Sequence, residues 1–277
     1  MKATTFQWRT RSVLAMTWVF TLLLGGIMAC GGDAGDNVEN TDAPDVAEKK
    51  ADMATAIDVH QIDQAIDQFP DEIREVVERL EDGRVRLDAI EIDPAKATIA
   101  FDGHVNMNEG LIEVMVCTSF GKTHESLFVT EARPMYLHAA CLLLGFRHGR
   151  NPAWLLPEDD PELDELRNEQ VGDMLDVVVS WVDDQGPHEV PAGQFLLDEK
   201  TGKTLEKVDW VFTGSYIDPA GVYAADRVGS MITNFHDFTA TIDLALERGR
   251  IDDYMVANKS AMPVKGASVH ITIRKAK

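Results

Sequence analysis

The chain has 277 residues, of which 45% are hydrophobic and 26% are charged, and its formal net charge is −21. This length is ample for one folded domain with a substantial core and marginal for two. The negative charge repels the phosphates of nucleic acids and anionic lipid headgroups, which argues against DNA or RNA binding and favours a solvated acidic surface or cationic partners.

The first 29 residues are predicted to form a signal peptide. They contain three basic residues, Lys2, Arg9 and Arg11, and no acidic residue. The apolar run that follows, Val13–Leu24, is too short to span a bilayer comfortably. The beginning of the chain therefore indicates export from the cytoplasm.

A lipoprotein processing motif comes directly after this segment. Ile27-Met28-Ala29-Cys30 resembles the bacterial lipobox, in which the cysteine is acylated and becomes the new N-terminus. Several acyl chains on Cys30 would hold the protein on a membrane, because each buried methylene contributes about 0.8 kcal/mol. Gly31 and Gly32 follow Cys30, so the chain lacks the aspartate that would indicate retention in the inner membrane. This favours an outer membrane if the cell has one. The alternative is an ordinary secreted protein that is cleaved nearby.

A flexible spacer is predicted from Gly31 to about Ala56, because this stretch has almost no large apolar residues to bury. Ile57–Glu81 then has the apolar periodicity of a helix, with a fresh start at Pro70 and an end at Gly83. We expect a single globular domain over residues 57–277, with a core from about 83 to 273.

After the helical segment, the apolar pattern changes to the period of two that is typical of strands. Thr98–Phe101 is predicted to be a strand that ends in a turn at Asp102-Gly103. Leu111–Cys117 and Glu125–Thr130 are strongly apolar, and the residues around Gly121 carry a turn signal. These two strands are therefore predicted to pair as a hairpin.

Pro134–Phe146 is predicted to be a buried helix, because Pro134 suits the first turn and Gly145 suits the end. The following loop, Arg147–Gln170, contains an acidic run over Glu158–Glu165. This run lacks the alternating Asp/Asn pattern and the central glycine of an EF-hand calcium loop, so we expect a solvated acidic loop.

Later strands are predicted at Met174–Val182, Gln194–Leu197, Val208–Thr213 and Ser268–Ile273. Strands outnumber helices, and no regular alternation of strands and helices appears. This predicts an α+β fold with a mainly antiparallel sheet, one buried helix and an N-terminal helical segment.

The predicted hairpin has the highest density of reactive side chains in the chain. With Gly121 and Lys122 as the turn residues, one face carries Cys117, Ser119, His124 and Ser126. A thiol or a hydroxyl near an imidazole is the chemistry of a nucleophilic hydrolase. The alternative is that these side chains satisfy backbone groups near the turn.

His124 and Glu125 are residue types that bind metals, but the sequence predicts no metal site. His-Glu-Ser-Leu-Phe lacks the second histidine of the H-E-x-x-H motif, and adjacent strand residues point apart. No cofactor is identified by any motif. Lys122 lies at the predicted turn, where lysine side chains are usually solvated.

Cys117 and Cys141 are the only cysteines after Cys30. An exported compartment permits a disulfide between them. Two buried free thiols are the favoured alternative, because both cysteines lie in apolar runs.

Two motifs resemble the signatures of the YdjY-like family of exported bacterial proteins. They are Gly-Lys-Thr-His-Glu-Ser at 121–126 and Trp-Val-Phe-Thr-Gly-Ser at 210–215. The resemblance covers about Gly83 to Ile273, and it includes Tyr223-Ala224-Ala225-Asp226 before Gly229. The activity of this family is undefined, so the resemblance implies a domain and a set of candidate ligand-binding residues. These are Lys122, His124, Glu125, Ser126, Trp210, Gly214, Ser215 and Asp226.

The sequence thus predicts a lipid-anchored extracytoplasmic domain that binds a small molecule or an envelope protein. Its pocket is expected between the hairpin and the end of the Trp210 strand. A hydrolase that uses His124 with Ser126 or Cys117 is one alternative. A structural envelope protein with an exposed apolar patch is the other.

Overall fold

The computed structural model describes residues 59–149, 172–205, 208–246, 249 and 255–276. The signal peptide, Cys30, the spacer and the acidic run at 158–165 lie outside the described residues, so the statements about them stay predictions. Within the described residues, no helix is both long enough and apolar enough to cross a bilayer.

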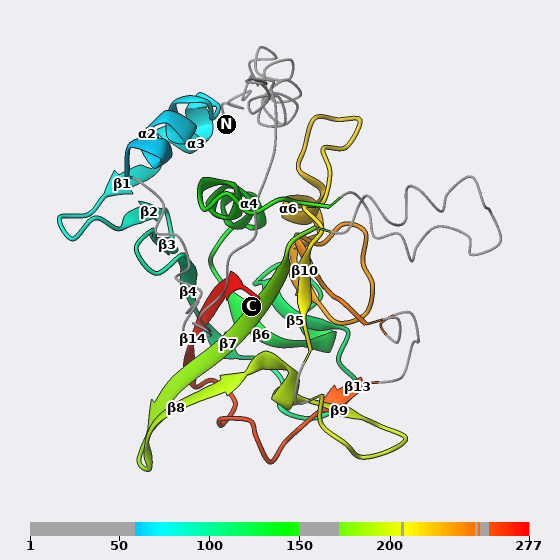
Figure 1. The fold of residues 1–277 in the computed structure, drawn as a ribbon. Coiled ribbons are helices and arrows are strands. Elements are labelled where there is room, and N and C mark those ends of the chain that lie inside the picture. The colour runs from blue at the N-terminus through cyan, green and yellow to red at the C-terminus, as the bar shows by residue number, and fades with distance from the viewer. Residues whose placement is uncertain (1–58, 150–171, 206–207, 247–248, 250–254, 277) are drawn as a thin grey trace, which may run out of the picture.

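Eight strands close into a barrel. The hydrogen-bonded order is β4-β14-β7-β10-β12-β11-β5-β6, and β6 pairs with β4 to complete the ring. Figure 1 shows these strands around one core, with β1, β2 and β3 extending the sheet beyond β4. The barrel strands are β4 Thr98–Val105, β5 Val114–Thr118, β6 Ser126–Thr130, β7 Met174–Asp183, β10 Trp210–Phe212, β11 Ser230–Thr233, β12 Ile242–Leu244 and β14 Ser268–Lys275.

The remaining elements surround the barrel. The strands outside it are β1 Val77–Arg79, β2 Val85–Leu87, β3 Ile90–Asp93, β8 Gly186–Pro191, β9 Leu196–Asp198 and β13 Met255–Ala257. The described helices are α2 Val59–Asp67, α3 Asp71–Arg74, α4 Pro134–Leu143 and α6 Ala224–Val228, with 3₁₀ turns at Thr123–Glu125 and Ala192–Phe195.

The prediction of an α+β fold with a mainly antiparallel sheet is therefore wrong. The described chain is mostly β and forms a closed barrel, and the pairs β5–β6 and β11–β12 are parallel. Closure depends on pairing between strands far apart in the sequence, such as β4 with β14. Local periodicity identifies strands but does not determine their neighbours.

Alternating side chains fill the interior of the barrel, as the period of a strand requires. On β7, Leu175, Val177 and Val179 are buried in the main core, and Ile271 and Ile273 face them from β14. The full length of Trp210–Phe212 is buried as well. Burial of this apolar surface is the main source of stability of such a fold.

The predicted hairpin is a parallel crossover. Val116 is opposite Phe128 and Thr118 is opposite Thr130, so β6 runs in the same direction as β5. Residues 119–125 must return along β5 before β6 begins, and they do so without an α-helix. This connection is short compared with the dozen or more residues that parallel neighbours usually need for a crossover.

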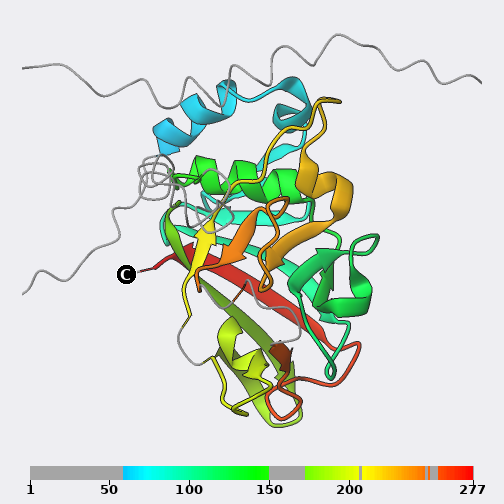
Figure 2. The same cartoon turned by 90° about the vertical axis from the view of Figure 1, so that its right-hand side faces the viewer.

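Helices cover one end of the barrel. α4 and α6 contact each other there, and α2 packs against the other side of α4 (Figures 1 and 2). As predicted, Pro134 occupies the first turn of α4, and Gly145 adopts the left-handed φ of 67° just beyond its end. The two-stranded sheet of β9 and β13 lies toward the opposite end (Figure 1).

Candidate functional site

A groove lies where the sheet divides along one edge of β4. β14 pairs with all of β4 from Thr98 to His104 on one edge. On the other edge, β3 pairs as far as Phe101, and β6 begins pairing only at His104. Asp102 and Gly103 therefore have no neighbouring strand on this edge. The gap between β3 and β6 opens into a groove of about 530 Å³.

Close packing holds the two sides of this division in place. Thr130 Oγ1 donates a hydrogen bond of 2.6 Å to the carbonyl oxygen of Asp102, and it accepts one from the Ala132 amide. A Cβ on Gly103 would stand 2.9 Å from the Val129 carbonyl oxygen, so only glycine allows β6 to approach this closely. Groups on well-ordered strands thus define the floor of the groove.

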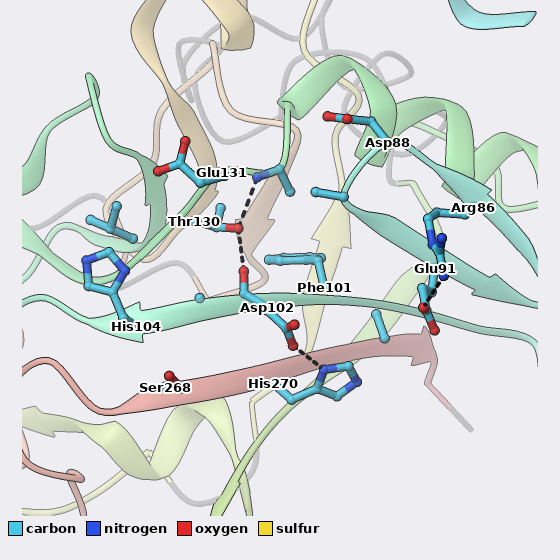
Figure 3. A pocket seen from close by; sticks show the side chains of 15 residues that line it. Arg86, Asp88, Glu91, Phe101, Asp102, His104, Thr130, Glu131, Ser268 and His270 are labelled. Atoms are coloured by element: carbon cyan, nitrogen blue, oxygen red, sulfur yellow. Dashed lines mark hydrogen bonds and ion pairs between the residues drawn. The ribbon is translucent and has the colours of Figure 1, made fainter. Parts of the chain in front are cut away.

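Polar side chains from several parts of the chain line this groove (Figure 3). Asp102 and His270 lie opposite each other on β4 and β14, and His270 Nδ1 is 2.8 Å from Asp102 Oδ1. The titratable lining residues are Arg86 on β2, Asp88 in the β2–β3 turn, Glu91 on β3, Asp102 and His104 on β4, Glu131 after β6, and His270 on β14. The arrangement suits a small ligand with polar groups, because pockets of about 300–1,000 Å³ are typical of such sites.

Sequence reasoning did not identify any of the titratable residues of this groove. The Asp102-Gly103 pair indicated a turn, whereas β4 runs through both residues to Val105. The available signal was the alternation of polar residues on two strands, Asp102 and His104 on β4 and Ser268 and His270 on β14. The alternation predicts a site only when the register of β4 and β14 is known, because the register determines which of these residues are neighbours.

The crossover brings together the charged residues of the first family motif. Lys122 Nζ lies 3.1 Å from Glu125 Oε1 and 3.5 Å from Glu113 Oε2. Burial and the nearby charge of Glu125 raise the pKa of Glu113. Burial opposes the charge of Lys122, but its hydrogen bond and ion pair with Glu125 leave its pKa raised. Lys122 thus forms ion pairs with two neighbouring carboxylates that would otherwise repel each other.

His124 and Ser126 do not form a nucleophile–base pair in this structure. The Ser126 side chain is fully buried, and its hydroxyl donates a 2.6 Å hydrogen bond to the Lys122 carbonyl oxygen. By contrast, 79% of the His124 side chain is exposed, and its Nε2 lies 3.6 Å from Glu125 Oε2. Asn106 Nδ2 donates to the carbonyl oxygens of Thr123 and Ser126. These contacts stabilise the shape of the crossover.

Both cysteines in the described part of the chain are buried free thiols. Cys117 belongs to a small cluster with Val114 and Val129, whereas Cys141 on α4 lies in the main core. Burial raises the pKa of both thiols. A raised pKa suppresses the thiolate form that a cysteine nucleophile needs.

The second family motif is structural over most of its length. Trp210 is 1% exposed and lies in the main core. Gly214 has a φ of 83°, and a Cβ there would stand 2.7 Å from the Cβ of His148. Ser215 Oγ donates to the Thr239 carbonyl oxygen and accepts a hydrogen bond from the Ala225 amide near the start of α6.

Asp226 connects α6 to the beginning of α4. Its Oδ1 accepts a hydrogen bond of 2.8 Å from the Met135 amide, and its Oδ2 lies 2.5 Å from Arg133 Nη2. A carboxylate at this place satisfies one of the free amides at a helix N-terminus. The contacts of Asp226 therefore hold two helices together.

Among the described residues, no hydrogen bond or ion pair joins residues 122–126 to Gly214, Ser215 or Asp226. The first motif packs instead against the end of α6, because Gly121 contacts Gly229. The described side chains contain no group of three or more His, Cys, Asp or Glu residues that could hold a metal ion.

The YdjY domain family matches residues 90–274, and the chain belongs to this family. This match covers the barrel strands, the crossover and the groove floor, and it confirms the resemblance found in the two motifs. No curated protein and no solved structure matches the chain significantly.

Proposed function

We propose that this chain is an extracytoplasmic lipoprotein whose YdjY domain binds a small ligand in the groove beside Asp102 and Gly103. The observation that carries the proposal is the division of the sheet, which leaves about 530 Å³ lined by polar groups on ordered strands. Binding groups mounted on a rigid sheet keep their geometry without a ligand, which reduces the entropy cost of binding.

The groove is a better candidate than the space near the family motifs. Ser126, Ser215 and Asp226 direct their side chains into hydrogen bonds with the backbone. Asp102 and His104 instead keep exposed side chains on the outer face of the sheet. Exposed polar groups at a concave surface are available to a ligand, whereas satisfied buried groups contribute to the fold.

Anchoring through Cys30 is the second part of the proposal. The support is the lipobox-like Ile27-Met28-Ala29-Cys30 and the polar spacer that follows it. Acylation would hold the domain at a membrane, and the spacer would let it extend into the extracytoplasmic space. Substitution Cys30→Ala should release the protein from the membrane fraction, and unchanged membrane association would refute the anchor.

A screen of thermal unfolding tests the groove. We expect at least one small molecule to raise the melting temperature of the detergent-solubilised mature protein. Ala100→Phe places a ring on the half-buried part of β4 that lines the groove, and it should abolish this shift. Ala95→Phe, in an exposed turn away from the groove, is the matched control and should leave the shift unchanged. Equal shifts in all three proteins would contradict binding in the groove.

A structural role with an envelope partner is the second candidate. Tyr216 and Phe238 are 37% and 48% exposed, and their rings stack at a centroid distance of 6.0 Å. Exposed aromatic pairs are typical of protein interfaces. A photo-cross-linker at position 238 should then give one discrete adduct in cells. A smear or no adduct would argue against this role.

A further inference from the structure

The charges of the groove are unequally compensated. Among the described residues, Arg86 is the only Lys or Arg side chain that lines it, and it already contacts Glu78 at 2.9 Å and Glu91 at 3.3 Å. Glu91 is also 2.5 Å from Arg84. The guanidinium of Arg86 is therefore shared between two carboxylates and is a poor receptor for an anionic ligand.

Three other carboxylates of the groove have no Lys or Arg partner among the described residues. The side chain of Asp102 is 88% exposed, and its one ion-pair contact is with His270. Asp88 and Glu131 are exposed and have no ion pair within the described part of the chain. Figure 3 shows Asp88 and Glu131 on opposite sides of the groove, and the Asp102 carboxylate turned toward His270. These carboxylates give the groove an excess of acidic groups, and the net charge of the whole chain, −21, has the same sign.

Apolar surface lies between these carboxylates. Ala89, Ala100 and Ala132 line the groove, and Phe101 and Val129 lie at its base. A ligand that satisfies both features has a positive group beside the carboxylates and a compact apolar body against the alanines.

From this combination we infer that the groove selects small organic cations, and specifically protonated amines that carry a compact apolar group. The inference rests on the proposed function, since it names the ligand class of that same groove. Binding should weaken as salt is added, because exposed charges are screened over about 8–10 Å at 0.10–0.15 M ionic strength.

Calorimetric titration with three probes of the same shape tests this selectivity. The probes are 2-phenylethylamine, 2-phenylethanol and phenylacetate, which present a cationic, a neutral and an anionic group on one aromatic body. They are titrated into the detergent-solubilised mature protein at pH 8, where imidazoles ordinarily carry little charge. We expect the amine to bind at least about tenfold more tightly than the alcohol, and phenylacetate to bind most weakly.

Two isosteric variants assign the selectivity to the groove. Asp88→Asn and Glu131→Gln remove charge from side chains that hold no ion pair in the described structure. Exposed ion pairs are worth about 0.2–1 kcal/mol, so each variant should weaken amine binding by roughly 1.5- to fivefold. The alcohol should bind all variants alike. Asp184→Asn, in the exposed β7–β8 turn, is the control and should leave the three affinities unchanged.

The results separate this inference from the function on which it rests. Tighter binding of phenylacetate or of the alcohol, lost in Ala100→Phe, would overturn the cation preference and leave binding in the groove intact. Amine binding that is equal in Asp88→Asn, Glu131→Gln and Asp184→Asn would also overturn it. If no probe binds, the cation inference fails, and the unfolding screen with Ala100→Phe decides separately whether the groove binds anything.

Discussion

A methyl group on Gly229 would stand 2.7 Å from the Cα of Gly121 and 2.4 Å from Thr118 Oγ1. This contact joins the crossover to the end of α6, and the Thr118 amide donates a hydrogen bond to the Gly229 carbonyl oxygen. Gly229 also has a φ of 76°, which side chains other than glycine rarely adopt. Backbone contact thus holds the crossover against the end of α6.

Gly229→Ala should therefore destabilise the protein strongly. Left-handed strain costs about 1–2 kcal/mol, and overlap in a packed region adds about 1–3 kcal/mol. Denaturant unfolding should show a loss of at least about 3 kcal/mol. Gly83→Ala is the matched control, because Gly83 has a φ of 86° and nothing within 4 Å of its added Cβ. Equal losses in the two variants would show that the glycine contact has no steric role.

Asp226→Ala should loosen α4 from α6. The variant loses a cap on the Met135 amide and leaves the Arg133 guanidinium without its closest carboxylate. Together these should cost about 2 kcal/mol in unfolding free energy. Hydrogen exchange in the first turn of α4 should accelerate in the same variant. Glu109→Ala, which breaks an exposed pair with Lys259, serves as the control and should change neither quantity.

Lys122→Met should destabilise the crossover in a pH-dependent way. Without the ammonium, the carboxylates of Glu113 and Glu125 repel each other, and the pKa of Glu113 should rise further above its usual value. A carboxyl whose pKa is raised by folding destabilises the native state where it is ionised. The deficit should be about 1 kcal/mol at pH 7 and should shrink as the pH falls through the raised pKa of Glu113, because protonation of this carboxyl removes the repulsion. A deficit that stays constant across this range would contradict the electrostatic role.

His138 should make the native state sensitive to acid. Burial, reinforced by the nearby His148, lowers its pKa to about 3, and its Nδ1 lies 2.9 Å from the Tyr223 hydroxyl. Between pH 3 and about 6.5 the unfolded chain binds a proton that the native state does not, so stability should rise with pH by up to about 1.4 kcal/mol per unit. His138→Gln should remove this part of the slope in pH-dependent unfolding. Identical slopes in the wild type and in His138→Gln would show that His138 is protonated in the native state.

Local chemistry was sufficient to predict individual elements of the fold. The proline that begins α4 and the glycine that follows its end can be identified from the sequence, and so can the alternation that identifies β7 and β14. The side-chain preferences of these elements act within a few residues, which is the range that a periodicity captures. The boundaries of α4 and β7 differ from the predicted ones by only a few residues.

Pairings between distant strands were not predictable in this way. Gly121 indicated a hairpin turn, but β5 and β6 are parallel, because the crossover folds back to place Gly121 against Gly229. Gly103 likewise indicated a turn, yet it is needed inside β4 for the close approach of Val129. In both cases the glycine permits close contact with a residue far along the chain, and the local sequence pattern does not indicate that contact.

The candidate site shows the same limit. The density of reactive groups around His124 and Ser126 predicted a site in this segment. In the structure, the polar groups of the crossover largely form hydrogen bonds and ion pairs with each other. The groove depends on Asp102 and His270, which are separated by 168 positions and meet only through the register of β4 and β14.

Native mass spectrometry of the purified protein tests the central claim most directly. The wild type is compared with Ala100→Phe, which blocks the groove, and with His124→Ala, which alters the exposed face of the crossover. Binding in the groove predicts an added small-molecule mass on the wild type and on His124→Ala, and its loss from Ala100→Phe. An added mass that Ala100→Phe keeps and His124→Ala loses would contradict the account and place the ligand at the crossover.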